Sequence, residues 1–192
     1  MTTIDDLRAA LEDDRWLADA EQRVRREPGA AAPLFARADR TLGREPLPEA
    51  PEWTAGQAGR AVLLAALPPE QIVPLYQQGD AHERLAVLKA LPLLAIGDAG
   101  VPLLHDALRT NDTRLVAAAL GPYARHLDQA AWRQGVVKCV FMGVPLDVVD
   151  RLAERTDDDL LAMLAGLAEE RAAAGRPMPA DAAALLTRRE PR

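Results

Sequence analysis

The side chains best suited to bind a small molecule are concentrated between His105 and Leu146. This stretch contains the polar triplet Arg109-Thr110-Asn111, a Pro122-Tyr123 step, and Lys138 within the most apolar run of the chain. These side chains donate hydrogen bonds, and two cations together favour an acidic or phenolic ligand. A second polar segment, near residue 170, could close such a site. We therefore predict a ligand-binding pocket lined by Arg109, Asn111, Tyr123, Lys138, Glu170 and Arg171.

The environment of Lys138 decides which chemistry is available. An ammonium group in an apolar run must reach solvent, pair with a carboxylate or contact a ligand, because a buried unpaired charge is unfavourable. If a carboxylate such as that of Asp106 or Glu170 is its partner, the lysine has only a structural role and fixes the register between neighbouring helices. An unpaired buried amine would instead lose its proton and act as a base or Schiff-base nucleophile, with Tyr123 as acid. The sequence leaves these alternatives open.

Helical spacing places Lys138 on a stripe of mostly small residues. In a helix from Asp128 to about Met142, residues 131, 135, 138 and 142 share one face, and they are Ala, Gly, Lys and Met. Small residues there would let another helix or a ligand approach closely. The neighbouring stripe is apolar, with residues four apart, and should face the core. The predicted core contains Trp132, Val136, Val140 and Phe141, with Leu88, Leu91, Leu103 and Leu115 around them.

The triplet that begins at Arg109 also has a purely structural interpretation. Arg109 stands at the predicted C-terminus of a helix, where the helix dipole favours a cation. Asn111 or Asp112 could cap the helix that follows. Capping alone explains this segment as well as a pocket does, so both interpretations remain open.

Motifs typical of metal and cofactor sites are missing from the sequence. His82, His105 and His126 are far apart, and the chain has a single cysteine, Cys139. This spacing does not match a zinc site, and no glycine-rich phosphate loop or GxSxG motif is present. We therefore expect no metal, no cofactor and no catalytic residue, and favour a non-enzymatic protein.

Composition favours a soluble helical protein that does not bind nucleic acid. The 192 residues are 49% hydrophobic but only 4% aromatic, and the net charge is −6. An acidic chain without a basic block is a poor partner for DNA, RNA or an anionic membrane surface. The N-terminus lacks the zones of a signal peptide, and the longest apolar run is too short to span a bilayer. We therefore expect a cytoplasmic protein that is not integral to a membrane.

Proline and glycine positions divide the predicted helices into three parts. Three prolines between Pro46 and Pro51 forbid a helix and indicate an extended segment. We predict an N-terminal helical cap over 1–45, a proline-rich linker over 46–53 and a helical array over 54–192. An arginine, an apolar helix and a proline recur from Arg60, Arg84 and Arg114, as in paired-helix repeats. The predicted class is all-α: paired antiparallel helices in a degenerate HEAT-like α-solenoid, with no sheet.

Several of these segments together resemble the EboA domain family. The matching segments run in family order from Tyr76 to Arg176, and each is weak alone but fairly specific in combination. They are Tyr76-Gln77-Gln78-Gly79-Asp80-x-x-Glu83, Ala86–Leu94, Arg109-Thr110-Asn111, Pro122-Tyr123, Val137–Leu146 and Glu170–Arg176. The chain departs from the family pattern twice. Gly121 stands where the family has asparagine before the Pro-Tyr step, and Arg155-Thr156-Asp157 replaces an Arg-x-Asn motif.

The resemblance implies a bacterial cytoplasmic helical protein that works with the other proteins of a secondary-metabolite cluster. It implies no catalytic residues. The leading hypothesis is a non-enzymatic adaptor or carrier in assembly, trafficking or export of the metabolite. The alternatives are a binding protein for an acidic or phenolic metabolite and a cryptic enzyme that uses Lys138.

Overall fold

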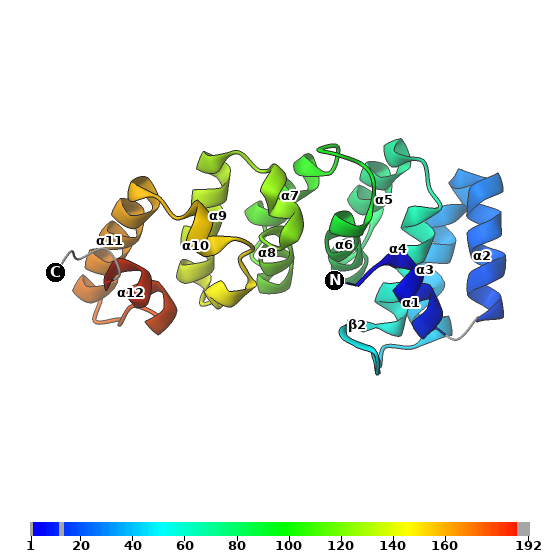
Figure 1. The fold of residues 1–192 in the computed structure, drawn as a ribbon, viewed down its shortest axis with the longest axis horizontal. Coiled ribbons are helices and arrows are strands. Elements are labelled where there is room, and N and C mark those ends of the chain that lie inside the picture. The colour runs from blue at the N-terminus through cyan, green and yellow to red at the C-terminus, as the bar shows by residue number, and fades with distance from the viewer. Residues whose placement is uncertain (1, 12–13, 188–192) are drawn as a thin grey trace. The chain divides into compact units, whose positions relative to one another are not determined.

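The computed structural model describes residues 2–11 and 14–187, and this part of the chain is mostly helical (Figure 1). It contains two compact units, which divide between Leu103 and Leu104. Among the described residues, no helix is both long and apolar enough to cross a membrane. The predicted helical class is confirmed, apart from one short hairpin.

The first unit is built from short helices and this hairpin. Its elements are α1 (Ile4–Ala10), α2 (Arg15–Arg26), η1 (Pro28–Ala30), α3 (Ala31–Leu42), β1 (Pro46–Leu47), β2 (Ala50–Thr54), α4 (Ala55–Ala65), η2 (Pro69–Gln71), α5 (Ile72–Gln78), α6 (Ala81–Ala90) and η3 (Leu91–Leu93). Side-chain caps set several helix starts. The predicted capping box of Asp80 and Glu83 is confirmed at α6, and Thr3 caps α1 as predicted. The HEAT-like arrangement and the cap–linker–array division remain predictions.

The prediction of no sheet is wrong at the proline-rich segment. Strands β1 and β2 pair antiparallel there, with Pro46 opposite Thr54 and Leu47 opposite Ala50. Proline is compatible with a two-stranded ribbon because each strand has one unpaired edge that needs no N–H donor. Leu47 and Trp53 are each 5% exposed. Burial of these two apolar side chains attaches the segment to the first unit, although its prolines alone indicated a linker.

Helix α4 is the centre of the first unit, and its glycines let α3 approach closely. A Cβ at Gly56 would lie 2.1 Å from Asp39 Oδ1. Arg60, one turn further along α4, is only 3% exposed and forms an ion pair with Asp39. Its Nε donates to the Phe35 carbonyl at 3.0 Å. A charge this deeply buried is tolerated because it is paired and hydrogen-bonded.

Asp39→Ala should therefore lower the free energy of unfolding by about 3 kcal/mol, because it leaves the Arg60 guanidinium buried without its counter-ion. Urea denaturation of the full chain measures this. Arg44 is the matched control, since its Nε lies 3.4 Å from the same carboxylate while its side chain is 73% exposed. Arg44→Ala should cost less than about 1 kcal/mol. Equal losses for the two variants would contradict this account of α4.

The second unit contains the segment that the sequence singled out. Its elements are α7 (Val101–Arg109, which begins before the unit boundary), α8 (Thr113–Ala119), η4 (Pro122–His126), α9 (Gln129–Met142), η5 (Leu146–Val148), α10 (Leu152–Arg155), α11 (Asp158–Ala173) and α12 (Ala180–Thr187). Helix α9 begins at the Asp128 cap and ends at Gly143, which adopts the left-handed conformation with φ 73°.

The predicted core is largely correct, with one error. Burial is confirmed for Trp132, Val136, Val140, Leu88, Leu91, Leu103 and Leu115. Phe141 is 65% exposed, so its assignment to the core is wrong. Consecutive residues of a helix are rotated by about 100°, so Phe141 leaves the stripe to which Val140 belongs. Its position in an apolar run suggested burial, but its helical phase points it to solvent.

Candidate functional site

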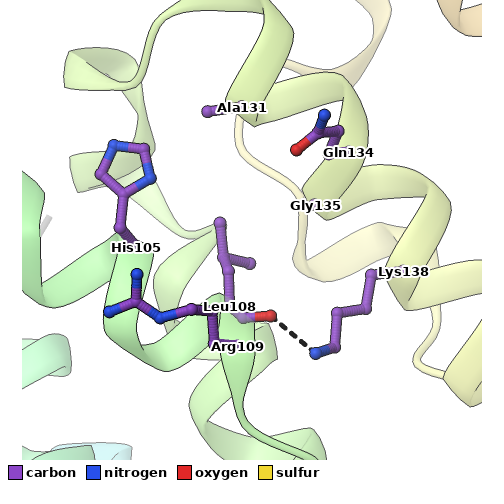
Figure 2. Close-up of a pocket in the computed structure, with 7 residues that line it drawn as sticks. All are labelled: His105, Leu108, Arg109, Ala131, Gln134, Gly135 and Lys138. Atoms are coloured by element: carbon purple, nitrogen blue, oxygen red, sulfur yellow. Dashed lines mark hydrogen bonds between the residues drawn. The ribbon is translucent and has the colours of Figure 1, made fainter.

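A surface pocket of about 360 Å³ lies between α7 and α9 in the second unit (Figure 2). Polar groups come from both helices, with an arginine and a histidine on α7 and a lysine and a glutamine on α9. Its lining residues are His105, Leu108, Arg109, Ala131, Gln134, Gly135 and Lys138. The predicted stripe of Ala131, Gly135 and Lys138 therefore does face a cavity, while Met142 is not part of the lining.

Gly135 forms the part of the pocket where the helices approach most closely. A Cβ at this position would lie 2.9 Å from Leu120 Cδ2 and 3.3 Å from Leu108 Cδ2. Contacts below 3.0 Å require the neighbours to shift, so only glycine fits this spacing without repacking. The missing side chain allows α9 to lie directly against leucines from α7 and from the end of α8.

Lys138 binds the C-terminal end of α7. Its Nζ donates a hydrogen bond of 2.6 Å to the Leu108 carbonyl, drawn as a dashed line in Figure 2. Carbonyl groups in the last turn of a helix have no intrahelical donor, and the helix dipole makes them a favourable site for a cation. Within residues 2–11 and 14–187, the side-chain hydrogen bond of Lys138 goes to this carbonyl and not to the carboxylate of Asp106 or Glu170. The lysine is therefore a structural link that also lines the pocket.

Arg109 supplies the second cation, on a side chain that is largely exposed. Its side chain is 75% exposed, and its Nη2 lies 3.5 Å from Asp106 Oδ1 one turn earlier on α7. An exposed pair at this distance contributes little to stability, so a ligand can compete for the guanidinium. His105 and Arg109 are four residues apart and share one face of α7, opposite Gln134 of α9. The pocket therefore offers several donors to an anion.

The remaining predicted site residues lie outside this pocket lining. Asn111 is exposed, and Asp112, rather than Asn111, caps α8 by accepting from Arg114 N at 2.9 Å. Tyr123 is 1% exposed, and its ring centroid lies 4.7 Å from that of His126. On α11, Glu170 is exposed, and Arg171 Nε donates to the Pro177 carbonyl at 3.1 Å. Of the six residues predicted, the structure brings together only Arg109 and Lys138.

Sequence reasoning missed His105 and Gln134 as lining residues. The available signal was helical spacing, because His105 precedes Arg109 by four positions and Gln134 precedes Lys138 by four. Both were overlooked because His105 was tested only as a metal ligand, and Gln134 is a polar residue of the kind expected on any exposed helix face.

A second lysine with an unusual environment, Lys89, lies in the first unit. Its Nζ donates to Gln57 Oε1 at 2.6 Å and to the Glu52 carbonyl, and lies 4.6 Å from the Trp53 ring centroid. Burial lowers the pKa of this amine to about 8. It joins α6 to the hairpin and to α4. Like Lys138, it stands in an apolar run, which is the signal that could have identified it.

The departure from the family pattern at Asp157 has a structural explanation. Asp157 caps α11 by accepting from Leu160 N at 3.0 Å, as an asparagine would. Its carboxylate also binds Arg133, with Nη2 to Oδ2 at 2.6 Å, and Gln129 Nε2 at 2.8 Å. The hydrogen bond from Arg133 lowers the pKa of this carboxyl well below its usual range. An aspartate therefore keeps the cap and adds an ion pair between α9 and α11.

Gly135→Ala should destabilise the chain by about 1–3 kcal/mol, because the new methyl group overlaps leucines that belong to two other elements. Gly166 is the matched control: it lies in α11, and a Cβ there would meet nothing within 4 Å. Gly166→Ala should leave stability unchanged or raise it by up to about 1 kcal/mol, since alanine favours the helix. Chemical denaturation of both variants tests the difference, and a Gly135→Ala protein as stable as Gly166→Ala would refute close packing at the pocket.

Asp157→Asn should make stability less sensitive to acid. The folded-state pKa of Asp157 lies below its ordinary value of 3.8, so its ion pair stabilises the fold above about pH 4 and is lost as the pH falls further. The variant keeps the cap but lacks the charge, and should be less stable by about 1 kcal/mol near pH 7. Thermal unfolding between pH 3 and 7 should show the two proteins converging toward low pH. A constant difference across that range would exclude the ion pair as its cause.

Comparison with known proteins identifies one family. No curated protein and no solved structure matches the chain. The model of the family described as metabolite traffic protein EboA matches residues 37–186. This range includes the whole pocket and most of both units, and it begins earlier than the resemblance noted in the sequence. The chain belongs to the EboA family of metabolite traffic proteins.

Proposed function

We propose that this protein is a non-enzymatic cytoplasmic carrier or adaptor in metabolite traffic that binds an anionic small molecule in the pocket between α7 and α9. The observation that supports this proposal is the convergence of Arg109 and Lys138 on one cavity, with His105 and Gln134 beside them. The family description supports a metabolite as the ligand, and we place that ligand in the cavity.

The charge balance of the lining favours an anion. Two cationic side chains, Arg109 and Lys138, face the cavity, and the ion pair of Arg109 with Asp106 is exposed, with 3.5 Å between Nη2 and Oδ1. Lysine has three N–H donors, and the Leu108 carbonyl occupies one of those of Lys138. The remaining donors can bind a carboxylate or phenolate oxygen, and a charge-assisted hydrogen bond of this kind is stronger than a neutral one. The volume of about 360 Å³ lies within the usual range for small-molecule sites.

The arrangement supports binding more strongly than catalysis. The enzyme hypothesis required Lys138 as base or nucleophile and Tyr123 as acid. Lys138 instead donates to a backbone carbonyl, and Tyr123 is buried against His126 outside the pocket lining. The Lys138–Tyr123 pair that the enzyme hypothesis requires is therefore not brought together at the cavity, and a carrier role does not require it.

The adaptor part of the proposal rests on helix stacking. Leu108 of α7 lies against both Gly135 and Lys138 of α9, so these two helices are neighbours although α8 lies between them in the sequence. Contact between alternate helices is expected in HEAT-like arrays, which often present binding surfaces to other proteins. We therefore include other proteins of the same metabolite cluster as partners.

The proposal is tested by complementation in source cells that lack this gene. Wild-type protein should restore the distribution of the metabolite between cells and medium, measured by mass spectrometry. The double variant Lys138→Met with Arg109→Gln removes both cations and should fail to restore it, while remaining folded by circular dichroism. Arg125→Gln, an exposed arginine of η4 outside the pocket, is the charge-matched control and should complement fully. Full complementation by the double variant would contradict the proposal.

A further inference from the structure

The stripe of α9 that lines the pocket continues for one more turn beyond it. Gln134 and Lys138 are four residues apart, and Phe141 and Met142 follow Lys138 by three and four. Residues at these spacings are neighbours on one helix face. Phe141 therefore lies about 4.5 Å further along the helix axis than Lys138. The polar pocket and this apolar turn form one continuous surface on α9.

Phe141 is conspicuous because its ring lies in solvent. It is 65% exposed, and the other large hydrophobic residue exposed in the described ranges is Met163, at 38%. An aromatic ring left in water gives up the free energy that its burial would provide. Met142, beside Phe141, is partly exposed as well. A ligand that reaches this turn would cover apolar surface that the fold itself leaves open.

We propose that the ligand is an amphipathic organic anion, with its acidic group at Lys138 and Arg109 and its apolar tail along Phe141 and Met142. This inference rests on the proposed function, because it takes the pocket as the site of the acidic group. The inference adds an apolar tail to the acidic group. Charge complementarity fixes the position of the acid, and the continuity of the stripe fixes the direction of the tail. A tail of roughly four to six carbons spans the distance to the next helical turn.

Simple probes separate the contributions of head and tail. Butyrate carries the acidic group with a short tail, octanoate carries the same group with four more methylenes, and octanol carries the long tail without charge. Their dissociation constants for the full-length protein can be measured by NMR titration. Octanoate should bind about tenfold more tightly than butyrate, since partial burial of four methylenes suffices for that ratio.

Two variants test where each part of the probe binds. Phe141→Ala should weaken octanoate to nearly the affinity of butyrate while leaving butyrate unchanged. Met163→Ala, the other exposed apolar residue, is the control and should change neither. Lys138→Met should weaken both carboxylates and leave octanol unaffected. Because Phe141 is largely exposed, its replacement should not alter the melting temperature.

The outcomes distinguish this inference from the function on which it rests. Equal affinity for butyrate and octanoate, or no effect of Phe141→Ala, would overturn the amphipathic ligand and leave an anion pocket in place. The anion pocket itself would be overturned if octanoate and octanol had equal dissociation constants and Lys138→Met did not weaken octanoate binding.

Discussion

The close approach of α9 to α7 at Gly135 is the constraint on which the candidate site depends. The absence of a side chain there lets α9 contact Leu108 and Leu120 directly. At this separation, Lys138, one turn later, reaches the Leu108 carbonyl at 2.6 Å and satisfies the end of α7. A larger residue at 135 would separate the helices and move the amine away from that carbonyl. The same contact therefore joins two helices and fixes one cation at the edge of the cavity.

Cationic side chains that bind carbonyls of another element recur through both units. In the first unit, the guanidinium of Arg60 and the amine of Lys89 each donate to a backbone oxygen outside their own helix. In the second, Arg155 donates to the Ala124 carbonyl at 2.7 Å, and Lys138 to that of Leu108. The Leu108 carbonyl lies in the last turn of α7, where it lacks an intrahelical donor, whereas the Phe35 carbonyl lies within α3 and that of Glu52 in β2. Hydrogen bonds to backbone oxygens of neighbouring elements thus let a chain rich in alanine and leucine keep charged residues in its apolar segments.

The helical class, the core face of α9 and the small-residue stripe could be predicted from the sequence, because each depends on periodicity within one element. Predictions that needed contacts between elements were weaker. Tyr123 and Asn111 stand near Lys138 in sequence order, yet one is buried against His126 and the other is exposed outside the pocket lining. The hairpin was missed because proline signals a break in helix, whereas the burial of Trp53 depends on neighbours that are distant in sequence. Phe141 lies in an apolar run but is exposed, because its position around the helix places it away from the core.

The proposed function places an acidic metabolite in the cavity between α7 and α9. The most direct measurement is native mass spectrometry of the protein isolated gently from its own cells, followed by denaturation and identification of what is released. We expect one acidic small molecule per chain in the wild-type protein, and its loss when Arg109 and Lys138 are replaced together. A wild-type chain that carries no small molecule, or a variant that retains it fully, would contradict the claim.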